Sequence, residues 1–474
     1  MKKQRFNFRL LALVCIGLLF VAGLYGVYSV TTYGPRWLSS SKNSRTTAAR
    51  KAVIQGDILD RNGVVLASTD ENGERTYQKS AASRSAVVHL VGDPQGKVGN
   101  AVDSFMSSYL LGMETGFSER VLALVKGEQR RGDDVTLTVD SVLSTRIARA
   151  FSTGAKTKGK SGAVVVLNYK TGEVLASVSL PVFDPLNIPE NVEDDALSPF
   201  WNRALRSTLP PGSTFKIVTA AAALQNLPDA STHVYTCTGA TQVLDRTITD
   251  AGNAQHGELK MEKAFTVSCN SAFAQMALLM GDDALRKTAE SFGFNENFLF
   301  RDLVVENSVY PTQNRNAVEI AWSGAGQSQV AATPMHMAMI AACVANDGVM
   351  MEPRLTRKVV SSAGVIRVRY TAKTYKRVLD EATAATLQAY MKNVVASGTG
   401  TAAKVSGLSI AGKTGSAESS QNGKAVTHAW FVGYIDSDAL PYAVCVLVED
   451  GGGGGSVAAP IAQDVFEYLQ NARP

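Results

Sequence analysis

The stretch that decides the fold is Leu209-Pro210-Pro211-Gly212-Ser213-Thr214-Phe215-Lys216. Two prolines and a glycine end whatever structure precedes them, and an alanine-rich run with good helix propensity follows at 217–225. We therefore expect Ser213 at or just before a helix N-terminus. Lys216 follows three residues later on the same helical face, so its amine is expected to reach the serine hydroxyl.

This pair has the chemistry of acyl transfer through a serine ester. A lysine in a dry site can lose its proton and act as the base toward a serine. The free N–H groups and positive dipole end of a helix N-terminus suit a developing oxyanion. The alternative is an N-cap serine followed by a surface lysine, and the spacing alone leaves both interpretations open, since Ser39 and Lys42 repeat it in a polar stretch.

The composition of the chain excludes some classes of protein function. The 474 residues suggest two or three domains, and 45% hydrophobic with 19% charged residues is ordinary for a globular chain. The formal charge is only +5 and no basic run is interleaved with aromatic residues, so nucleic-acid binding has no support. The five cysteines and five histidines are scattered without zinc-like spacing, so we expect isolated, mostly buried thiols, no metal and no cofactor.

The N-terminus predicts a membrane anchor. Basic residues precede an uncharged run at 10–30, which is about the length of a membrane-spanning helix and lacks a convincing cleavage site. We expect an uncleaved single-pass anchor at 10–30, a cytoplasmic tail at 1–9 and an extracytoplasmic remainder. Basic residues also follow the run, so flanking charge alone orients it weakly.

Between the anchor and the main domain, residues 31–133 are expected to form a stalk and a small module. Asn62-Gly63 between apolar residues predicts a β-hairpin turn. Residues 68–130 are weakly periodic, and no elements are assigned there. The stretch at 39–50 is polar, as in a stalk.

The main domain, 134–474, is expected to be α/β (α+β), with a central antiparallel sheet and an all-helical half. Strands are predicted near both ends of this region and helical patterns between them, which suggests one sheet built from the two ends. The glycine run 451–455 is expected to be a flexible loop. The predicted strands are 135–140, 163–167, 173–180, 409–413, 429–435 and 442–448, and the predicted helices include 141–153, 334–346, 380–396 and 459–469.

A second motif, Ser268-Cys269-Asn270, is expected in a short loop between two helices. Ser268 can relay a proton, and the amide of Asn270 can hold a substrate peptide or the base lysine. The alternative for this motif is a helix cap.

A third motif, Lys413-Thr414-Gly415, follows a short strand and precedes Ser416. A lysine with two flanking hydroxyls forms a site for a carboxylate. Gly415 is expected to let a ligand backbone lie close to the strand edge. Lys170-Thr171-Gly172 also matches, but it lies before the other motifs and predicts a hairpin turn.

In this order the three motifs are a known signature of β-lactamases and penicillin-binding proteins. The chain resembles the class B (monofunctional) penicillin-binding proteins, the peptidoglycan D,D-transpeptidases, over nearly its whole length. The segment 210–216 matches the nucleophile signature of the family. Further similar blocks are Asp60-Arg61-Asn62-Gly63, Thr333-Pro334-Met335, Gly398-Thr399-Gly400-Thr401 and His428-Ala429-Trp430-Phe431-Val432-Gly433.

The resemblance implies a role for each motif residue. Ser213 would be the acylated nucleophile, Lys216 its general base and Ser268 a proton relay. Asn270 would hold the donor peptide or orient the base. The carboxylate of a D-Ala-D-Ala stem would be bound by Lys413, Thr414 and Ser416 beside Gly415, and the N–H groups of Ser213 and Ser416 would form the oxyanion hole.

The resemblance also implies partners. These are peptidoglycan stem peptides, β-lactams and a separate polytopic polymerase of the shape, elongation, division and sporulation (SEDS) type, because 31–133 is too short for a glycosyltransferase. Residues 31–133 would include a pedestal, or dimerisation-like, domain, and the chain would be held in the cell membrane by one helix. The alternatives are a D,D-carboxypeptidase, a serine β-lactamase, or a catalytically silent scaffold or sensor.

Overall fold

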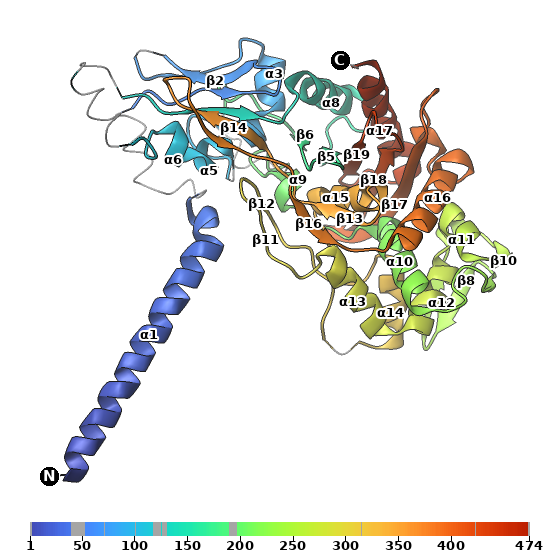
Figure 1. Cartoon of the computed structure of the whole chain (residues 1–474). Coiled ribbons are helices and arrows are strands. Elements are labelled where there is room, and N and C mark those ends of the chain that lie inside the picture. The colour runs from blue at the N-terminus through green and yellow to red at the C-terminus, as the bar shows by residue number, and fades with distance from the viewer. Residues whose placement is uncertain are drawn as a thin grey trace.

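The computed structural model describes residues 2–38, 53–70, 72–99, 101–116, 125, 130–188, 197–313, 315–421 and 423–472. Its first element, helix α1 (Lys2–Leu38), projects away from the rest of the chain (Figure 1). Within α1, Leu10–Ser29 is long and apolar enough to cross a membrane, and none of it is buried against the protein. The stalk expected at 39–50 lies outside the described residues.

A six-stranded sheet begins with the expected hairpin. Strands β1 (Ile58–Leu59) and β2 (Val65–Thr69) flank a turn in which Gly63 has φ +82°. The sheet order is β15-β14-β4-β1-β2-β3, so β14 and β15 from the second half of the chain join the sheet next to β4 (Figure 1). The division at 133/134 remains a prediction, and this sheet crosses it. Its other strands are β3 (Arg75–Tyr77), β4 (Asp134–Leu137), β14 (Thr356–Val360) and β15 (Ile366–Arg369).

Short helices complete this part of the molecule, where the sequence predicted no elements. Buried apolar side chains from the last three of these helices and from the sheet share one core cluster, whereas Ala86 of the first helix lies in a second cluster. The helices are α3 (Ala81–Ala86), α4 (Val88–Val91), α5 (Val102–Phe105) and α6 (Ser107–Leu110).

The expected central sheet is confirmed as a five-stranded antiparallel sheet in the order β17-β18-β19-β5-β6. Alternate residues of its strands face two separate clusters, as the period of two in a strand requires. One cluster includes side chains of α8 and α17, and the other includes α15, so helices cover both faces. The elements are β5 (Gly162–Asn168), β6 (Val174–Leu180), β17 (Ile410–Gln421), β18 (Lys424–Ile435), β19 (Tyr442–Val448), α8 (Ser141–Thr153), α15 (Pro334–Ala345) and α17 (Gly454–Asn471).

The helical half lies between β6 and β17 in the chain, as expected. Its central helix, α10 (Lys216–Asn226), is buried over its first eight residues. Five other helices surround it or pack nearby, and small hairpins lie at the edge. They are α11 (Met261–Val267), α12 (Asn270–Met280), α13 (Asp282–Phe292), α14 (Ala317–Gly324), α16 (Glu381–Ser397), β7 (Tyr235–Cys237), β8 (Ala240–Val243), β9 (Arg246–Thr249) and β10 (Gly257–Leu259).

The loop predicted at 451–455 is present at 451–453, but the prediction was wrong for Gly454 and Gly455, which belong to helix α17. Helix α17 begins at Gly454, five residues before the predicted start at 459. A Cβ atom at Gly454 would lie 2.3 Å from the carbonyl oxygen of Gly415 and 2.4 Å from that of Trp430. The glycine therefore allows the helix to start directly against two strands, and close packing overrides its low helix propensity.

Candidate active site

Ser213 lies in a short 3₁₀ turn, η2 (Gly212–Phe215), that leads directly into α10. The N–H of Gly212 donates to the carbonyl oxygen of Gly326 at 3.0 Å, and Gly212 has φ +54°. Ser213 is half-buried, whereas the next three residues are buried. The expected position just before a helix N-terminus is confirmed.

The side chain of Lys216 is completely buried and points to the Ser268–Asn270 loop. Its Nζ donates to the backbone oxygen of Ser268 at 2.7 Å, to Asn270 Oδ1 at 2.7 Å and to Ser268 Oγ at 3.3 Å. Among the described residues, Ser213 Oγ has no hydrogen-bond partner. The predicted contact between the lysine and this serine is therefore absent here, because the amine is taken by stronger carbonyl and amide acceptors.

Burial lowers the pKa of Lys216 to about 7, while the nearby Cys269 and Asp250 act in the opposite direction. The Nζ atom also lies 5.2 Å from the ring centre of Phe273, which offers a cation–π contact to the charged form. At neutral pH a large fraction of this amine is therefore uncharged, as a general base requires.

Ser268 has a left-handed backbone conformation between α11 and α12, with φ 62° and ψ 39°. For a residue other than glycine this costs roughly 1–2 kcal/mol. Cys269 then caps α12, where its Sγ accepts the N–H of Ala272 at 3.3 Å. The reversal brings Ser268 Oγ to 2.9 Å from Lys413 Nζ, so one hydroxyl contacts two lysines.

The side chain of Asn270 is fixed at both ends. Its Oδ1 accepts from Lys216, and its Nδ2 donates to the carbonyl oxygen of Thr249 at 2.9 Å. Its backbone N–H donates to Asp250 Oδ1 at 2.5 Å. This arrangement favours orientation of the lysine over binding of the donor peptide.

Lys413 and Thr414 approach the same place from strand β17. Lys413 is completely buried, donates to the Thr414 carbonyl oxygen at 3.2 Å and lies 5.6 Å from the ring centre of Phe265. Burial, and then the charge of Lys216, lower the pKa of Lys413 well below its usual range. The hydroxyls of Thr414 and Thr399 lie 2.5 Å apart.

Gly415 has a packing role that the sequence did not predict. A Cβ atom at Gly415 would lie 2.8 Å from the Pro211 carbonyl oxygen and 3.1 Å from the Thr214 side chain. The glycine therefore lets the serine turn pack against β17, and its predicted role beside a ligand backbone stays a prediction. The next residue, Ser416, is exposed, and its Oγ accepts the N–H of Gly454 at 3.2 Å.

A cavity of about 630 Å³ brings the motifs together, with Ser213, Ser268, Asn270, Thr414 and Ser416 in its lining. The two lysines reach it through Ser268, and β17 borders it as the edge strand of its sheet. The sequence did not single out most of the other lining residues. Only Thr399 lay in a noted block, and the others include Thr249, Asp250, His256, Trp322, Gln327 and Glu418.

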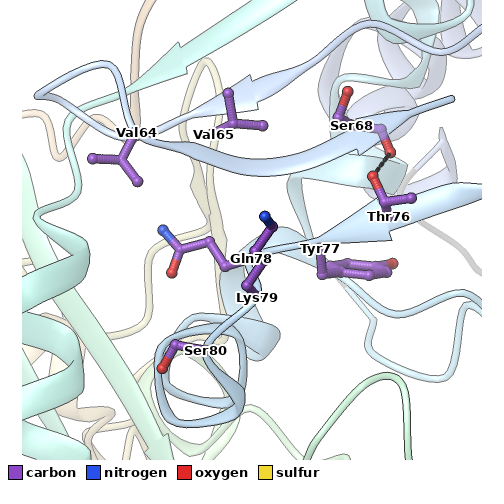
Figure 2. Close-up of a pocket in the computed structure, with 8 residues that line it drawn as sticks. All are labelled: Val64, Val65, Ser68, Thr76, Tyr77, Gln78, Lys79 and Ser80. Carbon is purple, nitrogen blue, oxygen red and sulfur yellow. Dashed lines mark hydrogen bonds between the residues drawn. The ribbon is translucent and has the colours of Figure 1, made fainter.

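A second hollow, of about 400 Å³, lies on the β2–β3 part of the molecule. Figure 2 shows its lining, where Thr76 Oγ1 donates to the Ser68 carbonyl oxygen at 3.2 Å. Its lining side chains include Lys79 and Tyr77 but no carboxylate and no histidine. The candidate catalytic side chains therefore lie at the cavity beside Ser213 and not at this second hollow.

All five cysteines are free thiols, and all except Cys15 are buried, as expected. The expectation that they are isolated was wrong for two of them. Ligand atoms of Cys237 and Cys269 lie within 4.8 Å of each other and of Asp250 and His256. This cluster could not be predicted from the sequence, because its members are spread over three separate segments.

Known proteins are similar to this chain in sequence and in fold. The family model described as "Penicillin binding protein transpeptidase domain" matches residues 162–467. The peptidoglycan D,D-transpeptidase PbpA of Mycolicibacterium smegmatis is 34% identical over 372 residues, which cover 73% of this chain and 74% of PbpA. The peptidoglycan D,D-transpeptidase MrdA of Acinetobacter baumannii is 29% identical, over 73% of this chain and 55% of MrdA.

Solved structures agree. Penicillin-binding protein A from M. tuberculosis, in a ceftriaxone acyl-enzyme complex, matches with a TM-score of 0.81 and 28% identity, over 89% of this chain and 99% of that one. The D,D-transpeptidase domain of a peptidoglycan glycosyltransferase from Eggerthella lenta matches with a TM-score of 0.75 and 30% identity, over 89% and 99%. With one N-terminal apolar helix before this domain, the chain belongs to the penicillin-binding protein transpeptidase family, in its class B.

Proposed function

We propose that this chain is a serine D,D-transpeptidase that cross-links peptidoglycan stem peptides and is acylated by β-lactams. The observation that carries the proposal is the Ser268 hydroxyl, which contacts both Lys216 and Lys413 beside Ser213. A buried amine with a pKa of about 7 supplies a base, and a second buried lysine supplies a site for a carboxylate.

In the first half of the reaction, neutral Lys216 accepts the proton of Ser213 as its Oγ attacks the carbonyl of the penultimate D-Ala. Lys413, Thr414 and Ser416 hold the terminal carboxylate of the donor. The N–H groups of Ser213 and Ser416 stabilise the oxyanion. The peptide C–N bond then breaks, Ser268 passes a proton to the leaving amine and recovers one from Lys216, and D-Ala departs from the acyl-enzyme.

In the second half, an amine from another stem attacks the ester carbonyl. Ser213 recovers its proton as the new amide forms. A β-lactam would acylate the same oxygen and remain, because its leaving group stays attached to the acyl chain. Glu418, an exposed carboxylate in the cavity lining, is the nearest feature that could serve a water-using carboxypeptidase or β-lactamase instead.

The cellular setting is part of the proposal. Leu10–Ser29 would anchor the chain in the cell membrane, with residues 1–9 in the cytoplasm and the cavity outside it. Residues 31–133 would be the stalk and pedestal, and 134–474 the transpeptidase domain. A polytopic polymerase of the shape, elongation, division and sporulation type would supply the glycan strands.

Mass spectrometry of the intact full chain after brief exposure to benzylpenicillin tests the nucleophile. We expect one stable adduct on Ser213, none in Ser213→Ala, and a wild-type adduct in the control Ser291→Ala, a serine outside the cavity lining. Many turnovers of penicillin per minute would instead indicate a β-lactamase. An adduct that persists in Ser213→Ala would contradict the assignment of the nucleophile.

A peptide assay then separates transfer from hydrolysis. A synthetic stem peptide ending in D-Ala-D-Ala is supplied with an amine acceptor, and released D-Ala is compared with the amide product. Equal amounts of both are expected from a transpeptidase. Release of D-Ala without amide would indicate a carboxypeptidase.

A further inference from the structure

One acidic side chain at the cavity beside Ser213 is not used by the proposed reaction. Glu418 is exposed in the cavity lining and lies on strand β17, two residues after Ser416. In the part of the chain that the structure describes, its carboxylate makes no hydrogen bond and no ion pair. A negative charge that faces a binding cavity without a protein partner is available to a cationic group of a ligand.

Strand β17 determines where this carboxylate lies. The strand pairs with β18 in an unbroken register from Ile410 to Gln421, so its side chains alternate between two faces. The cavity lining includes Thr414, Ser416 and Glu418 but none of the residues between them. At about 3.4 Å per residue, Glu418 lies roughly 7 Å along the strand from Ser416 and roughly 14 Å from Thr414.

The lysines of the site lie toward the other end of the same strand. Lys413 precedes Glu418 by five residues on β17, and its amine and that of Lys216 both contact Ser268. The other carboxylate of the lining, Asp250, is buried and accepts an N–H and a hydroxyl group from the first residues of α12. Along β17 the cavity therefore has an end that can bind a carboxylate, at Lys413, and an anionic end, at Glu418.

An extended donor peptide would contact both ends. Strand β17 is the edge strand of its sheet, so a peptide can pair with it as a further antiparallel strand. With its terminal carboxylate at Lys413 and its scissile carbonyl at the N–H of Ser416, as in the proposed reaction, the peptide runs toward Glu418. Paired strands advance by about the same length per residue, so the two residues before D-Ala-D-Ala would lie beside Ala417 and Glu418. Long side chains at either position can reach the carboxylate.

We infer that Glu418 binds an ammonium group that the donor carries on one of the two residues before D-Ala-D-Ala. This inference rests on the proposed function and deepens it, because it names the preferred donors as stem peptides with a free amine near the scissile bond. The two ends also set the direction of binding, since a reversed donor would bring its carboxylate to Glu418 and its ammonium group to the lysines. Glu418 is a specificity-determining residue, and no bond forms or breaks at its carboxylate.

Three penicillins with the same ring system supply matched probes. Benzylpenicillin has a neutral acyl side chain, ampicillin adds an ammonium group to it, and carbenicillin adds a carboxylate. Their ring carboxylate and lactam carbonyl correspond to the terminal carboxylate and scissile carbonyl of the donor, so the acyl side chain would lie toward Glu418. The second-order acylation constant of the full chain in detergent is measured for each, and the constants for ampicillin and carbenicillin are divided by that for benzylpenicillin. In Glu418→Gln the ampicillin ratio should fall roughly fivefold and the carbenicillin ratio should rise by a similar factor, as for an exposed ion pair.

Charge reversal and a matched control sharpen this test. Glu418→Lys should change both ratios further in the same directions, and added salt should weaken the preference of the wild type for ampicillin. Glu258→Gln, which changes an exposed glutamate on β10 outside the cavity lining, should keep both wild-type ratios. Wild-type ratios in Glu418→Gln and Glu418→Lys would overturn the inference. Equal slowing of all three penicillins by Glu418→Gln would also overturn it, because the carboxylate would then act in the chemical step.

Synthetic peptides then identify the source of the ammonium group. Release of D-Ala is compared for donors with lysine or norleucine at either position before D-Ala-D-Ala, with one acceptor amine in excess. The wild type should prefer lysine roughly fivefold in at least one position, and Glu418→Gln should lose this preference. A preference that follows the charge of the acceptor and not that of the donor would overturn the inference. Release of D-Ala without any preference for lysine would overturn this inference alone, whereas no acylation and no release by the wild type would refute the proposed function and the inference with it.

Discussion

Each of the two walls of the cavity contains a buried lysine, and the two lysines differ in their hydrogen-bond acceptors. In the helical wall (Lys216, Ser268 and Asn270), the amine has three acceptors, including a backbone carbonyl and an amide oxygen. In the strand wall (Lys413, Thr414 and Ser416), the amine has one hydroxyl and one backbone carbonyl. Both lysines are completely buried, and burial is the largest cause of the lowered pKa of each.

This difference separates chemistry from recognition. The lysine of the helical wall is held by fixed protein acceptors, so its position changes little when a ligand enters. The lysine of the strand wall lacks a full set of acceptors and lies next to two hydroxyl-bearing residues. A carboxylate would complete its contacts and raise its pKa again, since an opposite charge favours the ammonium form.

The largest effect is expected from loss of the base in the helical wall. Lys216→Met keeps the length of the side chain without the amine, and acylation by a fluorescent penicillin should slow about 10³-fold, within the usual range for a general base. Lys287→Met, an exposed lysine on α13, should label at the wild-type rate. A slowing of less than about tenfold would assign the base to another residue, with Lys413 the first alternative.

A smaller effect is expected in the strand wall. Lys413→Met removes a charge-assisted hydrogen bond to the ligand carboxylate, which should lower the second-order acylation constant by roughly 10–100-fold. The loss should fall mainly on binding, and an uncharged methyl ester of the same β-lactam should be affected much less. Equal losses for the acid and the ester would place Lys413 in the chemical step and remove the distinction between the walls.

The pH dependence of acylation is expected to follow the titration of Lys216 in the helical wall. Because the base must be neutral and the pKa of Lys216 is lowered to about 7, acylation should rise as pH increases through that value. Below it, the rate should change about tenfold per pH unit, since one proton must be lost. Rates measured from about pH 5 to about pH 9 with folded protein at each point provide the check. A flat profile would mean that the pKa of the base lies outside this range.

The smallest effect on acylation is expected where the walls meet the serine turn. Gly415→Ala forces a Cβ atom to 2.8 Å from the Pro211 carbonyl oxygen, so the turn or the strand must move. We expect a loss of about 1–3 kcal/mol in the free energy of unfolding and several-fold slower acylation. Gly99→Ala is the control, because its nearest neighbour is a flexible Arg206 nitrogen at 3.5 Å. Wild-type stability in Gly415→Ala would show that the contact with the turn is easily relaxed.

The central sheet and the long helices could be predicted from the sequence because the apolar patterns that indicate them are local. Helix α8 was predicted with the same bounds, and the strands of the five-stranded sheet were placed by their apolar runs. The six-stranded sheet was missed because β14 and β15 are short and the pairing of β14 with β4 joins segments far apart in the chain. Exposed and half-buried residues dominate β15, so its apolar signal is weak.

The motifs of the site could be predicted from the sequence, but the contacts that their residues make could not. Spacing placed Ser213, Ser268 and Lys413 in the right local structures, since each follows from a helix start, a loop or a strand. It could not show that Lys216 bonds to the Ser268 loop instead of Ser213, because that choice depends on acceptors from another helix. The role of Gly415 likewise depends on a turn about 200 residues earlier in the chain, whose carbonyl lies against it.

The pairing of β14 with β4 also bears on the order in which the chain is assembled. Strand β4 lies between β1 and β14, and β14 is made only after most of the helical half, from α10 to α15, has been synthesised. During synthesis of these helices one edge of β4 would thus stay open, and open edges invite pairing with other chains. Completion of the six-stranded sheet therefore waits for the second half of the chain, and a chain truncated before residue 356 would leave β4 without its partner β14.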